Sequence, residues 1–422
     1  MAQLSTNDGG LRRVHGSVGN GALGVPVAGG HDCDGDGLAD YALAAMRASP
    51  LNRILAGQIH LVFGNGTIQG AVDTAEARPD VLNILGDQTQ EAAGSEVWID
   101  DVTGDGIADL LIARQNHSPN DNLRGAGALS ILVGGPALKE LAATLEPLDL
   151  REPADTITMT TITGTQTAGR LGMWMRTGDV TGDGIADIVI GADQEGDTDT
   201  VHRGTAYVIR GGVHLAENRA IDLTQFGTTP LAGHIARILP GENIDHLHFG
   251  ATVQIADLDS NGRGEVLVAA ALNRAGGRQN AAGLSSTTAH STGGPTDGKL
   301  YIAWDDNFEA NPWPNGFSFS FASPPGSLTV ITGTDQNVSF GEEILGGLDY
   351  DNDGAADLFV GDLAGDGSNN RSRSFSGIAH VIYSSALLKD LVFDMDTPPA
   401  GVEFSTFIGA GVNEIAADTA AH

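Results

Sequence analysis

The sequence is poor in cysteine, in basic residues and in long apolar runs. Cys33 is the one cysteine among 422 residues, so no disulfide can form within the chain. Lys and Arg number 22 against 54 Asp and Glu, which gives a formal charge of −32 at pH 7. This balance argues against nucleic acid and anionic membranes as partners, because both need clustered basic side chains, and favours cation binding or strong solvation. No apolar run approaches the ~20 residues of a membrane helix, so we expect no membrane span.

Aromatic residues are also scarce, at 5% of the chain, whereas glycine is abundant, with 59 residues. Hydrophobic residues still make up 41% of the sequence, so we expect a folded protein and not a low-complexity tail. Many glycines beside a normal apolar fraction predict many tight turns, and therefore many short strands.

A short acidic pattern occurs five times along the chain. The copies are DCDGDGLAD from Asp32, DVTGDGIAD from Asp101 and again from Asp179, DLDSNGRGE from Asp257 and DYDNDGAAD from Asp349. Each copy is followed by a short apolar run such as LLIA or IVIGA, and is preceded by a glycine that lies 7 or 8 residues before its first Asp. Chance does not hold such a spacing five times, so the chain is a repeat array.

A second set of glycines, in segments such as ILG and ITG, marks the period of this array. They stand at positions 16, 86, 164, 241, 333 and 409, which are 70 to 92 residues apart. Each period contains about four strand-like segments, with a short helix-forming segment such as PALKELAATL between the third and the fourth. This pattern predicts an all-β fold, a β-propeller of four-stranded antiparallel blades with five blades visible. A solenoid is the competing architecture, but its periods are shorter, near ~20–30 residues.

The period also predicts the organisation of the chain. We expect an N-terminal segment at 1–13, a propeller at 14–410 and a C-terminal stub at 411–422 that resembles the start of a further repeat. The blades are expected at about 14–86, 87–164, 165–241, 242–333 and 334–410. The first 13 residues lack the apolar core of a secretory signal, so we expect any export signal to lie outside this sequence.

The acidic loops carry the chemistry of a metal site. Counted from the first Asp, oxygen-bearing side chains fall at positions 1, 3, 5 and 9, and a glycine at position 6 permits a turn that brings in the carbonyl of position 7. Six to eight hard oxygen donors suit Ca²⁺, whereas Mg²⁺ takes fewer protein ligands and Zn²⁺ prefers His or Cys. We predict up to five structural calcium ions, with these ligand positions: Asp32, Asp34, Asp36, Leu38, Asp40; Asp101, Thr103, Asp105, Ile107, Asp109; Asp179, Thr181, Asp183, Ile185, Asp187; Asp257, Asp259, Asn261, Arg263, Glu265; Asp349, Asp351, Asp353, Ala355, Asp357.

The alternative is an Asx-rich turn without metal, because Asp and Gly favour turns in any case. Five copies at one structural position weigh against it as a general explanation. The loop at Asp257 departs most from the pattern, since it carries Asn261 and the bulky Arg263. Three or four carboxylates in one turn repel one another unless a cation lies among them, so we expect each ion to close the turn between the first and second strand of its blade.

The glycine after Phe249 and Phe340, the DxDxDGxxD loop and the IVIGA run resemble the FG-GAP repeat of integrin α-subunit propellers and their bacterial relatives. The resemblance covers nearly the whole chain and is best in repeats three to five. It implies calcium in the loops on one face of the propeller and a ring that commonly has seven blades. With five blades visible, either the ring has five or the chain is a piece of a longer protein. The ligand-binding metal site of that family belongs to other domains or subunits, so the resemblance implies no receptor role.

An aromatic cluster in the fourth repeat departs from the pattern. It follows a polar insertion at 272–298, and its alternating Phe317, Phe319 and Phe321 are expected on one face of a strand packed between blades. Trp304 and Trp313 stand among Asp, Asn and Pro and are expected in loops. We therefore predict that these two tryptophans present a contact surface for a protein or glycan partner.

Three functions remain open at this point. The first is a calcium-binding, non-enzymatic β-propeller outside the cell or at its surface, used for protein binding, adhesion or assembly, because millimolar calcium there keeps weak loops filled. The second is a structural subunit of a surface layer, filament or larger complex. The third is a propeller-type hydrolase or lyase. It ranks last, since the sequence contains no HExxH, P-loop or GxSxG motif and predicts no catalytic residue.

Overall fold

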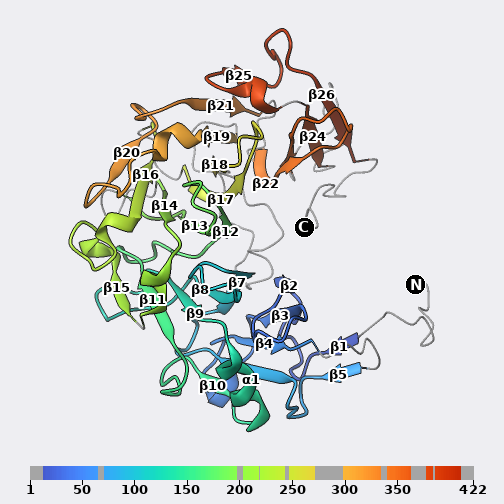
Figure 1. Cartoon of the computed structure of the whole chain (residues 1–422), viewed down its shortest axis with the longest axis vertical. Coiled ribbons are helices and arrows are strands. Elements are labelled where there is room, and N and C mark those ends of the chain that lie inside the picture. The colour runs from blue at the N-terminus through green and yellow to red at the C-terminus, as the bar shows by residue number, and fades with distance from the viewer. Residues whose placement is uncertain are drawn as a thin grey trace.

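The computed structural model describes residues 13–64, 71–196, 203–217, 219–242, 247–270, 298–333, 340–362, 377–383 and 385–409. The strands of this part form five sheets of four or five strands, which we call blades 1 to 5, and one two-stranded sheet. Figure 1 shows the blades in chain order around a central axis, as an arc with the blue blade 1 at one end and the red blade 5 at the other. The predicted all-β propeller is confirmed. The predicted C-terminal stub and the polar insertion up to residue 297 lie outside the described residues.

Each blade contains four antiparallel strands that follow one another along the chain. Their bounds are β2 (Val27–His31), β3 (Asp40–Ala45), β4 (Gln58–Val62) and β6 (Val81–Leu85) in blade 1; β7 (Ala93–Asp100), β8 (Asp109–Arg114), β9 (Ala128–Leu132) and β11 (Met159–Thr163) in blade 2; β12 (Met175–Gly178), β13 (Asp187–Ala192), β14 (Thr205–Ile209) and β16 (Ile235–Leu239) in blade 3; β17 (Phe249–Ala256), β18 (Glu265–Ala270), β19 (Lys299–Ala303) and β21 (Leu328–Thr332) in blade 4; β22 (Phe340–Leu348), β23 (Asp357–Asp362), β24 (Ile378–Ile382) and β26 (Phe404–Ile408) in blade 5.

A fifth strand, absent from the prediction, lies at the outer edge of blades 1 to 4. It comes from the following repeat and pairs in parallel with the fourth strand: β10 (Leu148–Asp149) with β6, β15 (Ala220–Asp222) with β11, β20 (Ser318–Ser320) with β16 and β25 (Val392–Asp394) with β21. The same parallel pairing joins β5 (Ala71–Asp73) to β1 (Arg13–His15) in the two-stranded sheet. Neighbouring repeats are therefore tied by backbone hydrogen bonds as well as by packing.

Helices are few and short. The predicted helical segment after β9 is α1 (Pro136–Ala143), which begins with a proline at a position where no backbone N–H is needed. The 3₁₀ helices are η1 (Pro50–Asn52), η2 (Val213–Ala216), η3 (Leu223–Gln225), η4 (Ala232–His234), η5 (Asp305–Phe308) and η6 (Ser385–Leu388). Among the described residues, no helix combines the length and the apolar character needed to cross a bilayer.

The core consists of apolar layers between neighbouring blades. Ile59 of blade 1 packs in one cluster with Leu110 of blade 2, and Val189 of blade 3 packs in another with Val266 of blade 4. All eight residues of β17 are buried, because a blade lies on each side of this strand. The equivalent strand β2, at the end of the arc, is largely exposed. Burial of a strand thus depends on its neighbouring blade, as expected of a repeat array in which each unit cannot cover its own apolar faces.

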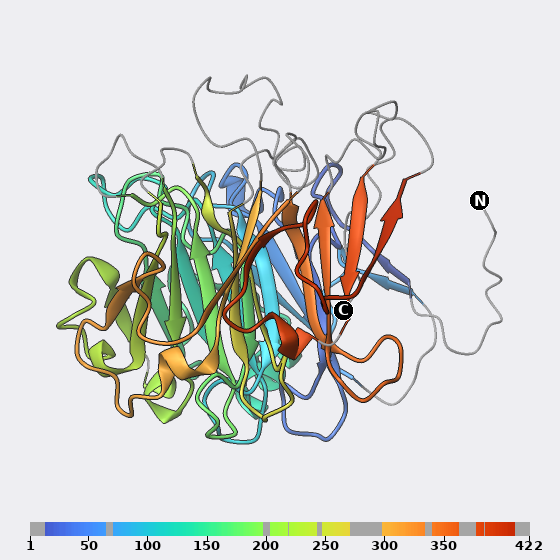
Figure 2. The same cartoon turned by 90° about the horizontal axis from the view of Figure 1, so that it is seen from above.

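The strand directions define two faces of the arc. The first strand of each blade runs into the acidic loop, and the second strand leaves it, so all five loops lie at one face, here called the acidic face. The ends of the second and fourth strands and the start of the third lie at the other face, called the distal face. Figure 2 shows the strands running between these two faces.

Candidate metal centres

The first aspartate of each loop holds the turn together. One of its oxygens accepts a hydrogen bond from the backbone N–H of the glycine at position 6, at 2.7–2.9 Å in all five loops. These glycines have φ between +83° and +90°, a conformation that L side chains avoid, which explains glycine at this position. The five pairs are Asp32 with Gly37, Asp101 with Gly106, Asp179 with Gly184, Asp257 with Gly262 and Asp349 with Gly354.

The residue at position 5 fixes the next part of the turn. Its side-chain Oδ1 accepts from the backbone N–H of position 7 at 2.7–3.0 Å. This holds for Asp36, Asp105, Asp183 and Asp353, and Asn261 takes the same role in the fourth loop. The second oxygen of each aspartate is not used in this bond. The loops therefore have one common geometry even where their sequences differ.

The residue at position 9 has a role that the sequence analysis missed. Asp109 is fully buried, and it accepts backbone N–H groups from Val102 and Thr103 at 3.0 and 2.9 Å and from Gly134, just beyond the third strand, at 2.9 Å. The same carboxylate in blades 1 and 3 accepts from Gly64 and Gly211. A glycine recurs after the third strand in all three repeats, and this was the available signal. Position 9 thus joins the loop to the third strand of its own blade.

Burial shifts the pKa of the carboxyl at position 9 in four of the five loops. It raises the pKa of Asp40, Asp109 and Asp187 to about 6, although each accepts backbone hydrogen bonds that act in the opposite direction. It raises the pKa of Glu265, where nearby acidic groups add to the effect, to about 8. Burial thus disfavours the carboxylate form of these groups, and a cation in the loop would offset that penalty.

Three of the loops bring carboxylate oxygens together in a form that suits a hard cation. The oxygens of each group lie within 4.8 Å of one another: Asp32, Asp34 and Asp36; Asp257, Asp259 and Glu265; Asp349, Asp351 and Asp353. Two predicted ligand atoms, Thr181 Oγ1 and Glu265 Oε1, are buried and have no hydrogen-bond partner among the described residues. A buried oxygen without a donor is costly unless an ion completes its coordination. The residues present therefore fit an oxygen-bound divalent cation, and the donor set contains no His or Cys.

The acidic loops also contact the following blade. The carbonyls of Asp32 and Cys33 accept from the N–H groups of Ala108 and Gly135 in blade 2, at 2.9 and 2.8 Å. The carbonyl of Val102 accepts from Gly212 of blade 3, and that of Asp179 accepts from Gly264 of blade 4. The order of each loop is thus coupled to the position of the next blade.

Side chains at position 7 form a second contact between successive loops. A Cβ placed on Gly104 would lie 2.7 Å from Ile185 Cδ1 of the next loop. The corresponding contacts are 3.2 Å for Gly35 with Ile107 and 2.9 Å for Gly182 with Arg263. Position 7, predicted only as a carbonyl ligand, therefore also packs its side chain over the glycine at position 4 of the preceding loop.

A further cluster of potential ligands, outside the loops, is an ion-pair network. Asp87, Glu91 and His117 have oxygen and nitrogen atoms within 4.8 Å of one another. The guanidinium of the buried Arg114 lies 3.3 Å from Asp87 and 3.2 Å from Glu91. This cation already compensates both carboxylates, so we assign the cluster to the packing of blades 1 and 2.

The predicted aromatic contact surface is wrong. Trp304 is 0% exposed and Trp313 is 1% exposed. Their indole N–H groups donate inward, to Thr329 Oγ1 at 3.0 Å and to the carbonyl of Phe308 at 3.1 Å. Polar neighbours in the sequence suggested loops at the surface, but the large apolar area of each ring is buried between blades, where it stabilises the fold. The expected packing of Phe317, Phe319 and Phe321 between blades 3 and 4 is confirmed, with Phe317 partly buried. Only Phe319 lies within a strand, β20, and the other two flank it.

Part of blade 3 matches a known protein family. The FG-GAP repeat family model matches residues 172–209, which run from the start of blade 3 through its acidic loop to the end of β14. Residues 172–209 are thus similar to an FG-GAP repeat. The chain is 30% identical over 185 residues to integrin alpha-PS2 of Drosophila melanogaster. That alignment covers 43% of the chain and 11% of the relative, so the chain spans a small part of the relative's length.

Proposed function

We propose that this chain is a calcium-stabilised, non-enzymatic propeller module for protein binding, adhesion or assembly outside the cell. The observation that carries the proposal is the set of five acidic loops with one hydrogen-bond geometry, three of which are joined through position 9 to the third strand of their own blade. Similarity to an integrin α subunit supports a binding role over a catalytic one. Oxygen donors from side chains at positions 1, 3 and 5 and from the carbonyl at position 7 would hold the ion.

Calcium fits these loops better than the other common divalent cations. The donors are hard oxygens in a flexible turn, and the site offers carboxylate, hydroxyl and carbonyl groups together. Loops of this kind bind weakly when their charge is low, and the loops at Asp101 and Asp179 have Thr at position 3. Extracellular calcium at millimolar concentration would fill such loops, which is the reason for placing the protein outside the cell.

Bound calcium would act on the arrangement of blades and not on a reaction. It would neutralise the carboxylates of each turn and complete the coordination of Thr181 Oγ1 and Glu265 Oε1. Because the loop carbonyls accept hydrogen bonds from the following blade, an ordered loop fixes the next blade as well. An arc whose blades are held in a fixed arrangement suits a module that presents a surface to a partner.

Calcium titration of the purified chain tests this proposal. We expect up to five ions per chain by isothermal titration calorimetry with parallel metal analysis, and we expect Asp183→Asn to lose about one of them. The matched control is Asp121→Asn, which removes a carboxylate from an exposed side chain outside the loops and should leave the stoichiometry unchanged. The proposal is overturned if the wild-type chain binds no calcium at millimolar concentration.

A further inference from the structure

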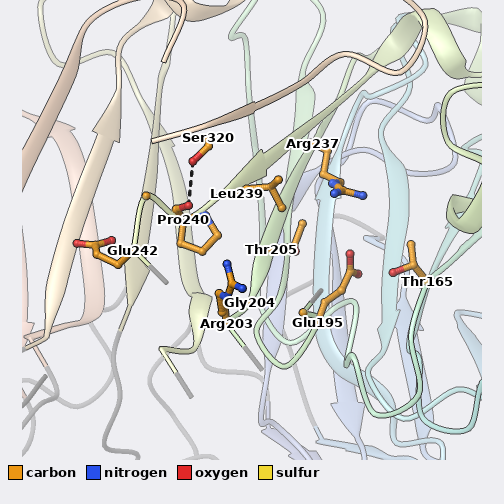
Figure 3. A pocket seen from close by; sticks show the side chains of 12 residues that line it. Thr165, Glu195, Arg203, Gly204, Thr205, Arg237, Leu239, Pro240, Glu242 and Ser320 are labelled. Carbon is orange, nitrogen blue, oxygen red and sulfur yellow. Dashed lines mark hydrogen bonds between the residues drawn. The ribbon is translucent and has the colours of Figure 1, made fainter. Parts of the chain in front are cut away.

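Two buried glutamates have a carboxyl oxygen without a hydrogen-bond partner among the described residues, Oε2 of Glu195 and Oε1 of Glu265. Glu195 lines a cavity of about 510 Å³ at the distal face, here called the distal pocket. Figure 3 shows its carboxyl directed toward the guanidinium of Arg237, which can balance its charge. Glu265, at position 9 of the fourth acidic loop, is in a different situation, because it faces two other acids.

The residue two places beyond the third strand of a blade, here called the strand exit, decides what position 9 can do. In blades 1 to 3 the strand exit is Gly64, Gly134 or Gly211, and its backbone N–H donates to the position-9 carboxylate. A Cβ on these glycines would lie 2.3–2.6 Å from the carbonyl oxygen of position 8, closer than side chains come. The strand register places Asp305 at the strand exit of blade 4.

Asp305 has a Cβ, so the strand exit of blade 4 cannot approach its loop in the same way. Oε2 of Glu265 still accepts from the backbone N–H of Leu258, at 2.6 Å, as Asp109 does from Val102 in blade 2. Oε1, however, is left without the donor that the glycine supplies elsewhere. The side chain is 0% exposed, so bulk water does not replace that donor.

Glu265 belongs to a carboxylate cluster that differs from those of the other loops. One oxygen each of Asp257, Asp259 and Glu265, at positions 1, 3 and 9, lie within 4.8 Å of one another. The clusters of the first and fifth loops are formed by positions 1, 3 and 5 instead. Carboxylates at this distance repel one another, and a buried one is costly without a compensating charge. A hard cation among the three would supply that charge and occupy Oε1.

Position 5 of the fourth loop is engaged elsewhere. Oδ1 of Asn261 accepts from the Arg263 N–H at 2.8 Å, and its Nδ2 donates to Asp305 Oδ2 at 3.2 Å. Where the other loops have a second carboxylate oxygen, this residue has an amide nitrogen, which cannot ligate a cation. The guanidinium of Arg263 lies 3.3 Å from the same oxygen of Asp305. Asp305 and Arg263 together therefore hold the amide nitrogen of Asn261 toward η5.

We propose that the fourth loop is a calcium site of a separate kind, with Asp257, Asp259 and Glu265 as its carboxylate ligands and Asn261 as a structural residue of the turn. Asp305 is a positioning residue, because its place at the strand exit leaves Oε1 of Glu265 to the ion. The inference rests on the proposed calcium binding and deepens it, since the donor set differs from the one proposed for the other loops.

Calcium titration of the whole chain, with parallel metal analysis, tests this donor set. Glu265→Gln should lower the number of bound calcium ions by one, because the amide brings no charge to the ion. Glu309→Gln is the matched control, since it makes the same change at an exposed residue directly after η5 and should leave the number unchanged.

A second comparison keeps the inference testable if Glu265→Gln fails to fold. Asn261→Ala and Asp353→Ala change position 5 of the fourth and fifth loops, where both side chains are exposed and both accept the N–H of position 7. The two variants lose the same hydrogen bond. Asn261→Ala should keep the number of ions of the wild type, whereas Asp353→Ala should lose one.

Asp305→Gly tests the positioning role. It restores the glycine of blades 1 to 3, so the strand exit can approach the loop and donate to Oε1 of Glu265. We expect the affinity of one calcium site to fall by about threefold or more, because this hydrogen bond competes for the ligand oxygen. The other sites should be unchanged, and an equal fall at every site would contradict the positioning role.

Two results overturn the inference: a full number of ions in Glu265→Gln, or the loss of an ion in Asn261→Ala. Either result, in a chain whose wild type binds calcium, leaves the proposed function in place. A wild-type chain that binds no calcium would overturn both.

Discussion

The ammonium group of Lys139 lies 2.6 Å from the Asp36 carboxylate, in the first acidic loop, and 2.5 Å from that of Asp34. Lys139 belongs to α1 of blade 2, so this helix reaches back to the loop of the preceding blade. The hydrogen bond from Lys139 holds the pKa of Asp36 below its ordinary value. The first loop therefore has a cation of its own, with which the proposed calcium ion would have to compete.

Replacing this lysine should strengthen calcium binding at the first loop. Lys139→Met keeps the length of the side chain and removes the competing charge, so we expect the affinity of one site to rise by about three- to tenfold. Calorimetric titration measures the change. Lys389→Met is the matched control, because Lys389 lies 3.7 Å from Asp306, outside the loops, and loses the same charge. Equal gains in both variants would show a general charge effect and contradict the role of Lys139.

The contact between successive loops should be visible in stability. Gly104 has φ +75°, and a Cβ there would meet Ile185 Cδ1 at 2.7 Å. Gly24→Ala serves as the control, since Gly24 has φ +90° and open space around its Cα. We expect Gly24→Ala to lower the free energy of unfolding by about 1–2 kcal/mol, from backbone strain alone. Gly104→Ala should lower it by about 1–3 kcal/mol more, because the added Cβ overpacks the contact with Ile185. Urea unfolding of both variants measures the difference, and equal losses would mean that the contact contributes nothing.

Acid should destabilise blade 5 through His380. This side chain is buried against Phe340 and Phe404, and burial lowers its pKa to about 4. The unfolded chain has a histidine pKa near ~6.5, so it binds more protons than the folded chain between these values, and stability is lost as the pH falls from about 6.5 to about 4. The loss from this one group is up to about 3 kcal/mol.

A variant that lacks only this histidine isolates that effect. His380→Gln should lose less stability than wild type over the same pH interval, measured by urea unfolding at several pH values. His15→Gln, at an exposed position, should follow wild type. If all three proteins lose stability in parallel, the acid sensitivity belongs to other groups.

The repeat and its five loops were predictable from the sequence because they depend on local spacing. Asp and Gly at fixed positions of a tight turn determine the loop geometry, and the apolar run after it determines the second strand. The fifth strands were not predictable in this way. β10 has two residues and carries no pattern of its own, so only pairing with β6 from the preceding repeat creates it.

The environment of single side chains depended on the three-dimensional arrangement. Trp304 and Trp313 lie among polar residues in the sequence, yet they are buried. The cluster between blades 4 and 5 encloses Trp304, and the cluster between blades 3 and 4 encloses Trp313. The distal pocket combines Thr165, Glu195 and Arg237 from three separate segments. No spacing rule relates these positions, which become neighbours only when blades 2 and 3 pack side by side.

Thermal unfolding with and without calcium tests the central claim most directly. If calcium binds the folded loops and not the unfolded chain, as proposed, each filled site adds about 2.7 kcal/mol at a calcium concentration a hundredfold above its Kd. We predict that a calcium chelator lowers Tm by several degrees or more, and that excess calcium, but not equal ionic strength of NaCl, restores it. A Tm that is the same in chelator and in millimolar calcium would contradict the account.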